Sequence, residues 1–279
     1  MTATHLSSTA LNAIIIGMPR SGTSLTAGLF ARKNYYVASD TSRELRPGDQ
    51  FNPFGYWEAE PLTNHNAAIL GMAGFSFHNT WLFDRVSRDI ARRIAELQPT
   101  MEHRDYVKAF AQHRPWVWKD PRLCYTLSYW WPLMDPLTTR VVVVRRDSAA
   151  ILHSFQRLNW RSKSATDQTD VLRRIDDHVA AATRTIDALR IPYLEINYSD
   201  YFSSPALVAR KLSETFHIAL GTEDLNALRE LDHNSWRGRL IDNVAAVARI
   251  LPPGVKRTIK RIASRAGLKV SPRATHHRP

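Results

Sequence analysis

The chain has 279 residues, of which 44% are hydrophobic and 23% charged, which suits one large buried core and excludes a disordered protein. Its single cysteine, Cys124, excludes an intramolecular disulfide and favours a reducing, cytoplasmic setting. The formal net charge of +12 would suit a nucleic-acid-binding protein, but eight basic residues lie between Lys256 and Arg278, where no acidic residue occurs. We therefore expect no nucleic-acid partner.

Short apolar segments alternate with helical patterns along the chain. Residues 12–17 read as a buried strand that is too short to span a bilayer and lacks the basic flank of a signal peptide. A glycine-rich turn then opens an apolar helix at about residues 22–32. A long insert follows, with a loop at residues 46–56 and helical patterns at about residues 61–70 and 84–110. The later predictions are strands at residues 116–118, 140–144 and 193–197, helices at about residues 148–160 and 167–189, and an apolar helix after Pro205.

This order of elements predicts an α/β fold, namely a three-layer sandwich with a central parallel sheet and a helical insert between the first two strands. In such sheets ligands bind at the carboxyl ends of the strands, and the candidate functional residues all follow strands. We expect residues 1–251 to form a single domain, with the insert at about residues 46–114. Residues 252–279 then form a basic, amphipathic C-terminal tail.

The segment after the first strand, Gly17-Met-Pro-Arg-Ser-Gly-Thr-Ser24, has the spacing of a phosphate-binding loop. Backbone N–H groups of such a loop, together with the dipole of the helix that follows, hold an anion. In a loop that binds a nucleoside triphosphate the residue after the second glycine is Lys, whereas this chain has Thr23 there and carries its positive charge at Arg20. The loop therefore argues against hydrolysis of ATP or GTP, and an ordinary glycine-rich turn is the alternative.

A second candidate anion site follows the strand at residues 140–144. Arg146 stands at the strand end and Ser154 two helical turns later, so that a guanidinium group and a hydroxyl group can converge on one phosphate. The alternative is a solvated helix terminus with a surface hydroxyl.

Together the two motifs resemble those of the bacterial-type sulfotransferase family that uses 3′-phosphoadenosine 5′-phosphosulfate. The 5′-phosphosulfate loop of that family reads Pro-Lys/Arg-Ser-Gly-Thr-Thr/Ser, which residues 19–24 match, and its 3′-phosphate motif has the separation of Arg146 and Ser154. Weaker similarities lie at residues 52–58, 118–122 and 193–200, and the resemblance runs from about residue 14 to 216. It implies a P-loop-like fold without a metal, and donor-binding residues Arg20, Ser21, Gly22, Thr23, Ser24, Arg146, Ser154 and Tyr198.

The same resemblance implies transfer of a sulfuryl group to a hydroxyl or amine of a small-molecule, glycan or lipid acceptor, with the insert as the acceptor lid. Arg20 and Lys119 are the expected catalytic cations. Many family members place a His base where this chain has Pro121, so Glu58 is the preferred base, with His65 and Asp120 as alternatives.

Two other functions remain open at this point. The chain could be a P-loop nucleotide-dependent kinase, or a non-catalytic basic protein that binds nucleic acid or a membrane. Val255, Ile259, Ile262 and Ala266 share one side of a possible tail helix, which predicts either peripheral membrane contact or docking on the domain. The sequence does not predict the oligomeric state.

Overall fold

The computed structural model describes residues 10–46, 48, 52, 55–75, 86–158 and 165–229. Within them lies a four-stranded sheet in which every neighbouring pair is parallel, in the order β2-β1-β3-β4. The strands are β1 (Asn12–Ile16), β2 (Val117–Lys119), β3 (Thr139–Arg145) and β4 (Tyr193–Asn197). The predicted α/β class with a central parallel sheet is confirmed.

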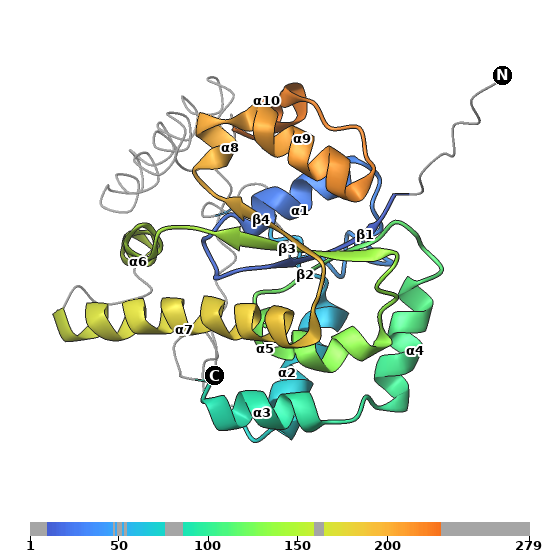
Figure 1. Ribbon diagram of the computed structural model, residues 1–279, viewed down its shortest axis with the longest axis vertical. Coiled ribbons are helices and arrows are strands. Elements are labelled where there is room, and N and C mark those ends of the chain that lie inside the picture. The colour runs from blue at the N-terminus through green and yellow to red at the C-terminus, as the bar shows by residue number, and fades with distance from the viewer. Residues whose placement is uncertain are drawn as a thin grey trace, which may run out of the picture.

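Helices cover both faces of the sheet and give the molecule three layers (Figure 1). On one face lie α1 (Thr23–Arg32), α8 (Asp200–Ser203), α9 (Pro205–Phe216) and α10 (Thr222–Arg229). On the other lie α2 (Glu60–Met72), α3 (Arg88–Glu96), α4 (Met101–Phe110), α5 (Leu123–Trp130) and α7 (Ala165–Leu189). A short 3₁₀ turn, η1 (Trp131–Leu133), follows α5, and α6 (Ser148–Arg157) begins just past the end of β3.

The central strands are apolar throughout because both of their faces are buried. Ile14 and Ile16 pack into the core beneath α2, α5 and α7, whereas Ala13 and Ile15 pack into the core beneath α1 and α9. Four consecutive valines give β3 the same two-sided burial. This pattern is typical of a parallel sheet covered by helices, and it leaves the carboxyl edge of the strands as the place for polar side chains.

The insert between β1 and β2 contains α2, α3 and α4. The single helical pattern predicted at about residues 84–110 is wrong, because the structure has two helices there, separated at residues 97–100. Pro99 lies in this break, and proline lacks the backbone N–H that a continuous helix needs. The hydroxyl of Thr100 then caps α4 by accepting from the N–H of His103 at 3.3 Å.

Several sequence-based predictions fall on residues outside the described ranges. These are part of the loop at residues 46–56, the end of the predicted helix at residue 160, the domain end near residue 251 and the tail at residues 252–279. Among the helices that are described, none is both long and apolar enough to cross a membrane.

Candidate functional site

The loop at residues 17–22 connects the end of β1 to α1 and depends on two glycines. Gly17 has φ +156°, and a Cβ atom there would lie 2.6 Å from the carbonyl oxygen of Val144 in β3. Gly22 has φ +103°, and a Cβ atom there would overlap Cδ2 of Tyr198. Glycine is therefore required at both ends of the loop, for its backbone angles and for the close approach of neighbouring strands.

The N-terminus of α1 has neither a side-chain cap nor an acidic residue. Its N-cap residue, Gly22, provides no side-chain hydrogen bond, and its first turn contains no acidic residue. Ser21 is 1% exposed, and its Oγ atom has no hydrogen-bond partner among the residues described. The first N–H groups of a helix lack partners within the helix, and the helix dipole adds partial positive charge there. These features favour a bound anionic oxygen at this point.

Arg20 joins the loop to the second motif. Its Nε atom donates to Ser154 Oγ at 3.1 Å, and its carbonyl oxygen accepts from Arg146 Nη1 at 2.7 Å. The structure thus brings together the two motifs, which lie more than a hundred residues apart in the sequence. Burial lowers the pKa of Arg20, and the positive charges of Arg157 and Arg146 lower it further.

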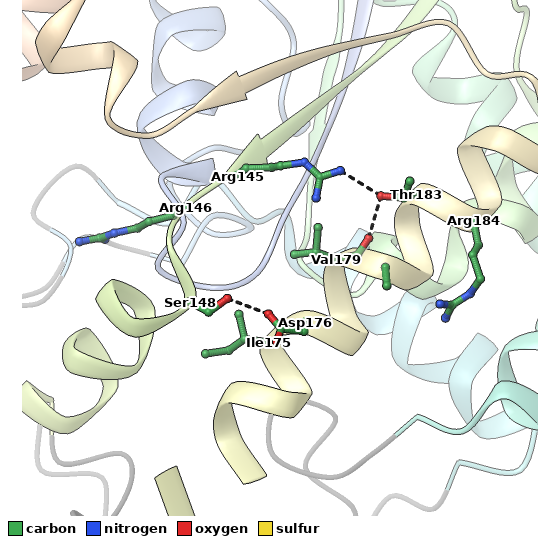
Figure 2. Close-up of a pocket in the computed structure, with 9 residues that line it drawn as sticks. Arg145, Arg146, Ser148, Ile175, Asp176, Val179, Thr183 and Arg184 are labelled. Carbon is green, nitrogen blue, oxygen red and sulfur yellow. Dashed lines mark hydrogen bonds between the residues drawn. The ribbon is translucent and has the colours of Figure 1, made fainter. Parts of the chain in front are cut away.

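Of the two arginines at the end of β3, Arg146 is the one that donates a hydrogen bond to the loop. Figure 2 shows the side chains of Arg145 and Arg146 pointing in opposite directions. Arg145 donates to Glu195 Oε2 at 2.5 Å and to Thr183 Oγ1 at 3.1 Å. The guanidinium group of Arg146 instead lies 4.3 Å from the ring centroid of Tyr198, which is a cation–π contact.

A pocket of about 440 Å³ lies between the end of β3, the start of α6 and α7 (Figure 2). Arg146 lines this pocket and also donates to the carbonyl oxygen of Arg20 in the loop. Its wall combines cations, hydroxyl groups and an apolar surface, and it is lined by Arg145, Arg146, Ser148, Ile175, Asp176, Val179, Ala180, Thr183 and Arg184.

Lys119 and Glu58 form an ion pair beside the loop. Lys119 is the last residue of β2 and pairs in register with Ile15 of β1, so its strand ends next to the loop. Its Nζ atom lies 2.5 Å from Glu58 Oε1, and the two side chains are 3% and 15% exposed. Glu58 stands just before α2, in a segment attached to α1 by the hydrogen bond from Ser24 Oγ to the carbonyl oxygen of Tyr56, at 3.4 Å.

Asp120 is fully buried, and both of its oxygens are engaged. Oδ1 accepts from the backbone N–H and the side chain of Arg122, at 3.0 and 3.1 Å, and Oδ2 accepts from Asn66 Nδ2 at 2.9 Å. Burial raises the pKa of Asp120, and the Arg122 guanidinium opposes that change. The geometry fits a carboxylate that orients its neighbours.

His65 lies apart from the Lys119–Glu58 pair. On α2 its neighbour Asn66 faces Asp120, whereas the ring of His65 faces α4, 4.9 Å from the His103 ring and with Nδ1 3.7 Å from Glu102 Oε1. It lines a cavity of about 750 Å³ between α2 and α4. Burial lowers the pKa of His65, and Glu102 opposes the change. The structure therefore brings Glu58, but not His65, to Lys119.

Two further residues act electrostatically on Arg20 and were not predicted from the sequence. Burial is the main cause of the lowered pKa of Arg20; Tyr56 opposes the change and Arg157 adds to it. The helical repeat carried a signal for Arg157, because it lies three residues after Ser154 and hence on the same side of α6. Tyr56 lies in the segment of weaker family similarity at residues 52–58, which gave it no role at Arg20.

The described residues contain no group of three or more His, Cys, Asp or Glu side chains that could hold a metal ion.

In comparisons with known proteins, no protein-family model matches the chain, and no curated protein matches it. Among solved structures, the chain is similar to the sulfotransferase domain of the Synechococcus PCC 7002 olefin synthase. The identity is 18%, the TM-score is 0.44, and the match covers 77% of this chain and 75% of that one.

Proposed function

We propose that this chain is a sulfotransferase that moves a sulfuryl group from 3′-phosphoadenosine 5′-phosphosulfate to a hydroxyl or amine of a small-molecule, glycan or lipid acceptor. The observation that carries the proposal is the junction at Arg20. Hydrogen bonds from Arg20 to Ser154 and from Arg146 to Arg20 unite a phosphate-type loop with a second cationic motif. A donor with phosphate groups at both ends of its ribose requires two such cationic subsites side by side.

In this proposal the 5′-phosphosulfate lies at the N-terminus of α1. The N–H groups of the first turn and the hydroxyl groups of Ser21, Thr23 and Ser24 are its ligands, and the unpartnered Ser21 Oγ supports that role. Arg146 and Ser154 hold the 3′-phosphate. Tyr198 contacts the nucleoside in this proposal, and the position of its ring beside Gly22 and Arg146 supports that role.

The reaction forms a bond from the acceptor oxygen or nitrogen to sulfur and breaks the bond from sulfur to the bridging oxygen of the donor. Its loose transition state gathers negative charge on the leaving phosphate and on the equatorial sulfuryl oxygens. Arg20 and Lys119 are the cations that stabilise this charge. Glu58 takes the proton of the acceptor, because its carboxylate lies beside Lys119 at 2.5 Å. Adenosine 3′,5′-bisphosphate then leaves.

The location proposed for the reaction is the cytoplasm. Cys124 is fully buried, and burial raises its pKa to about 12, so its thiol stays protonated. A buried, protonated thiol of this kind neither needs nor readily forms a disulfide. The proposed compartment therefore rests on the single cysteine of the sequence, which excludes an intramolecular disulfide.

The test is transfer of labelled sulfate from the donor to a panel of alcohols, phenols, amines and glycans. Arg20→Ala should lower kcat by about 100-fold or more, because it removes a cation from the transition state. Glu58→Gln should bind the donor normally and lose most of kcat, whereas His65→Gln serves as the matched control and should retain it. If Glu58→Gln keeps full activity and His65→Gln loses it, the general base is His65. If Arg20→Ala turns over as fast as the unaltered chain, the catalytic role given to Arg20 is wrong.

A further inference from the structure

We propose that Gly28 of α1 is a positioning residue for the general base, Glu58. Gly28 leaves the space in which the indole ring of Trp57 lies against α1, and the position of Trp57 fixes that of its neighbour Glu58. The inference rests on the proposed function, which makes Glu58 the base, and it deepens that function by naming what sets the base in place. Gly28 and Trp57 belong to neither donor-binding motif.

The segment that precedes α2 runs along one side of α1. Ser24 and Gly28 are four residues apart in this helix, so they lie on the same side of it, on successive turns. Ser24 Oγ donates to the carbonyl oxygen of Tyr56 at 3.4 Å. At Gly28 a Cβ atom would lie 3.1 Å from Nε1 and 3.6 Å from Cε2 of Trp57. Consecutive residues of the segment therefore contact consecutive turns of α1.

The backbone of α1 does not itself require a glycine at residue 28. Gly28 is buried in the interior of the helix, where glycine is less favourable than every other residue except proline. Alanine would strengthen the helix, but its methyl group would lie nearer to the indole than the separation of about 3.5–4.0 Å at which non-bonded carbon atoms attract each other best. The close approach of Trp57 therefore explains why the position has no side chain.

The ring of Trp57 is held by its fit to α1 and not by a hydrogen bond. Its Nε1 atom is buried and has no hydrogen-bond partner among the residues described. The ring packs against a buried cluster that includes Leu25 and Leu29 of α1 and Val117 of β2. The backbone of Trp57 has φ +54°, in the left-handed region, and such angles persist where the surroundings determine them. The packing of the ring thus determines the path of the chain at Trp57.

That path matters because Glu58 is the next residue. Its Oε1 atom lies 2.5 Å from Nζ of Lys119. On the far side of Glu58, the N–H of Glu60 donates to the carbonyl oxygen of Glu44 at 2.7 Å, so the chain is held on both sides of the base. A displacement of Trp57 would be passed directly to the carboxylate. A misplacement of about 1 Å at a reacting group can cost about 100-fold in rate.

The test introduces Gly28→Ala and Gly28→Val into the full chain. Crystal structures measure the distance from Lys119 Nζ to Glu58 Oε1, which should increase from the unaltered chain to Gly28→Ala and exceed about 4 Å, the limit of an ion pair, in Gly28→Val. In the transfer of labelled sulfate, kcat should fall about tenfold or more in Gly28→Val and less in Gly28→Ala. Calorimetry should find the Kd of adenosine 3′,5′-bisphosphate changed less than about twofold, because the proposed donor ligands of α1 lie in its first turn.

A double-mutant cycle with Trp57→Ala separates the proposed contact from a general effect on α1. In a chain that already carries Trp57→Ala there is no indole ring to displace, so adding Gly28→Val should lower kcat by less than about twofold more. If the losses from the two substitutions are instead independent, or if Gly28→Val leaves the ion pair unchanged, the inference is wrong. Should Gly28→Val fail to fold, the same cycle is measured with Gly28→Ala, which favours the helix.

Gly71→Val is the matched control, because it makes the same exchange in the last turn of α2. It should keep both kcat and the distance between Glu58 and Lys119, and an equal loss of kcat in this variant would count against a specific role of Gly28. If the unaltered chain transfers no sulfate, the proposed function fails, and no base remains for Gly28 to position. If the unaltered chain is active and Gly28→Val keeps its kcat, the proposed function stands and this inference alone is wrong.

Discussion

Arg20 shows how a single residue defines the candidate site. Its φ is +71°, in the left-handed region that residues other than glycine rarely adopt. Hydrogen bonds at both ends of the residue hold it there, since its carbonyl oxygen accepts from Arg146 and its guanidinium group donates to Ser154. Uncommon backbone angles persist where the surroundings determine them, and they cluster at ligand sites. The position of the loop therefore depends on β3 and α6 as well as on its own sequence.

The lowered pKa of a second residue, His178, should make the stability of the folded chain depend on pH. His178 is 1% exposed, its Nε2 lies 3.0 Å from the carbonyl oxygen of Pro121, and burial lowers its pKa to about 4. In the unfolded chain His178 has the ordinary His pKa of 6.5, so below that pH the unfolded chain binds a proton that the folded chain does not. The contribution of the neutral, buried His178 to folding stability is therefore complete above pH 6.5 and is lost as the pH falls towards 4. The expected loss from this group is about 3 kcal/mol in the free energy of unfolding.

Urea unfolding at several pH values between 7 and 4 measures this loss. His178→Gln should flatten the pH dependence, and the exposed His153→Gln on α6 should leave it as in the unaltered chain. The same slope in all three proteins would contradict the assignment to His178.

At the residue scale, the sequence predicted the members of the site better than their arrangement. The loop and the pair Arg146 and Ser154 stand out because their chemistry and spacing are specific, although their roles with the donor stay predictions. Arg157 did not stand out, because one more arginine on a helix resembles a solvated surface residue. The ion pair of Lys119 with Glu58 joins segments that only the folded insert brings together.

At the scale of elements, a buried polar network attaches the insert to the sheet. Asn66 of α2 is 0% exposed and donates to Asp120 after β2, and its Oδ1 accepts from Thr126 Oγ1 at 2.7 Å and from Trp130 Nε1 at 2.8 Å in α5. One side chain therefore satisfies polar groups from two other elements. Such a network holds α2, and with it the Glu58 end of the insert, against β2.

Asn66→Ala should lower the free energy of unfolding by about 2–4 kcal/mol, because it leaves the buried Trp130 N–H without its acceptor and removes one hydrogen bond from the buried Asp120 carboxylate. Asn64→Ala is the matched control, since Asn64 lies on the exposed side of the same helix, and its change should stay within about 0.5 kcal/mol. Denaturation in urea measures both. Equal effects of the two substitutions would show that the network does not stabilise the fold.

The sequence pattern predicted most of the elements but missed one helix in the core. The four strands and the helices α1, α2 and α7 lie close to their predicted ranges. The helix α5 was not predicted, because seven of its eight residues are buried and it shows no alternation of polar and apolar positions. In the insert, the helical pattern continued across Pro99, whose effect on the backbone divides α3 from α4.

At the scale of the whole molecule, the proposed donor site predicts which nucleotides stabilise the fold. Adenosine 3′,5′-bisphosphate at about 100 times its Kd should stabilise the native state by about 2.7 kcal/mol, which corresponds to a rise in Tm of about 5–10 °C. ATP at the same concentration should have little effect, because Thr23 stands where a triphosphate loop has Lys. Differential scanning fluorimetry measures both shifts. A larger shift with ATP would favour a nucleotide-dependent kinase.

The central position of β1 also has a consequence for biosynthesis. Ala13 pairs with Val117 on one side and with Arg140 on the other, so both neighbours of this strand are translated roughly 100 residues or more after it. On the ribosome, the apolar segment Asn12–Ile16 emerges long before either partner exists. The nascent chain must carry an unpaired, aggregation-prone strand until β2 emerges, and β1 can have both of its neighbours only when β3 has left the exit tunnel.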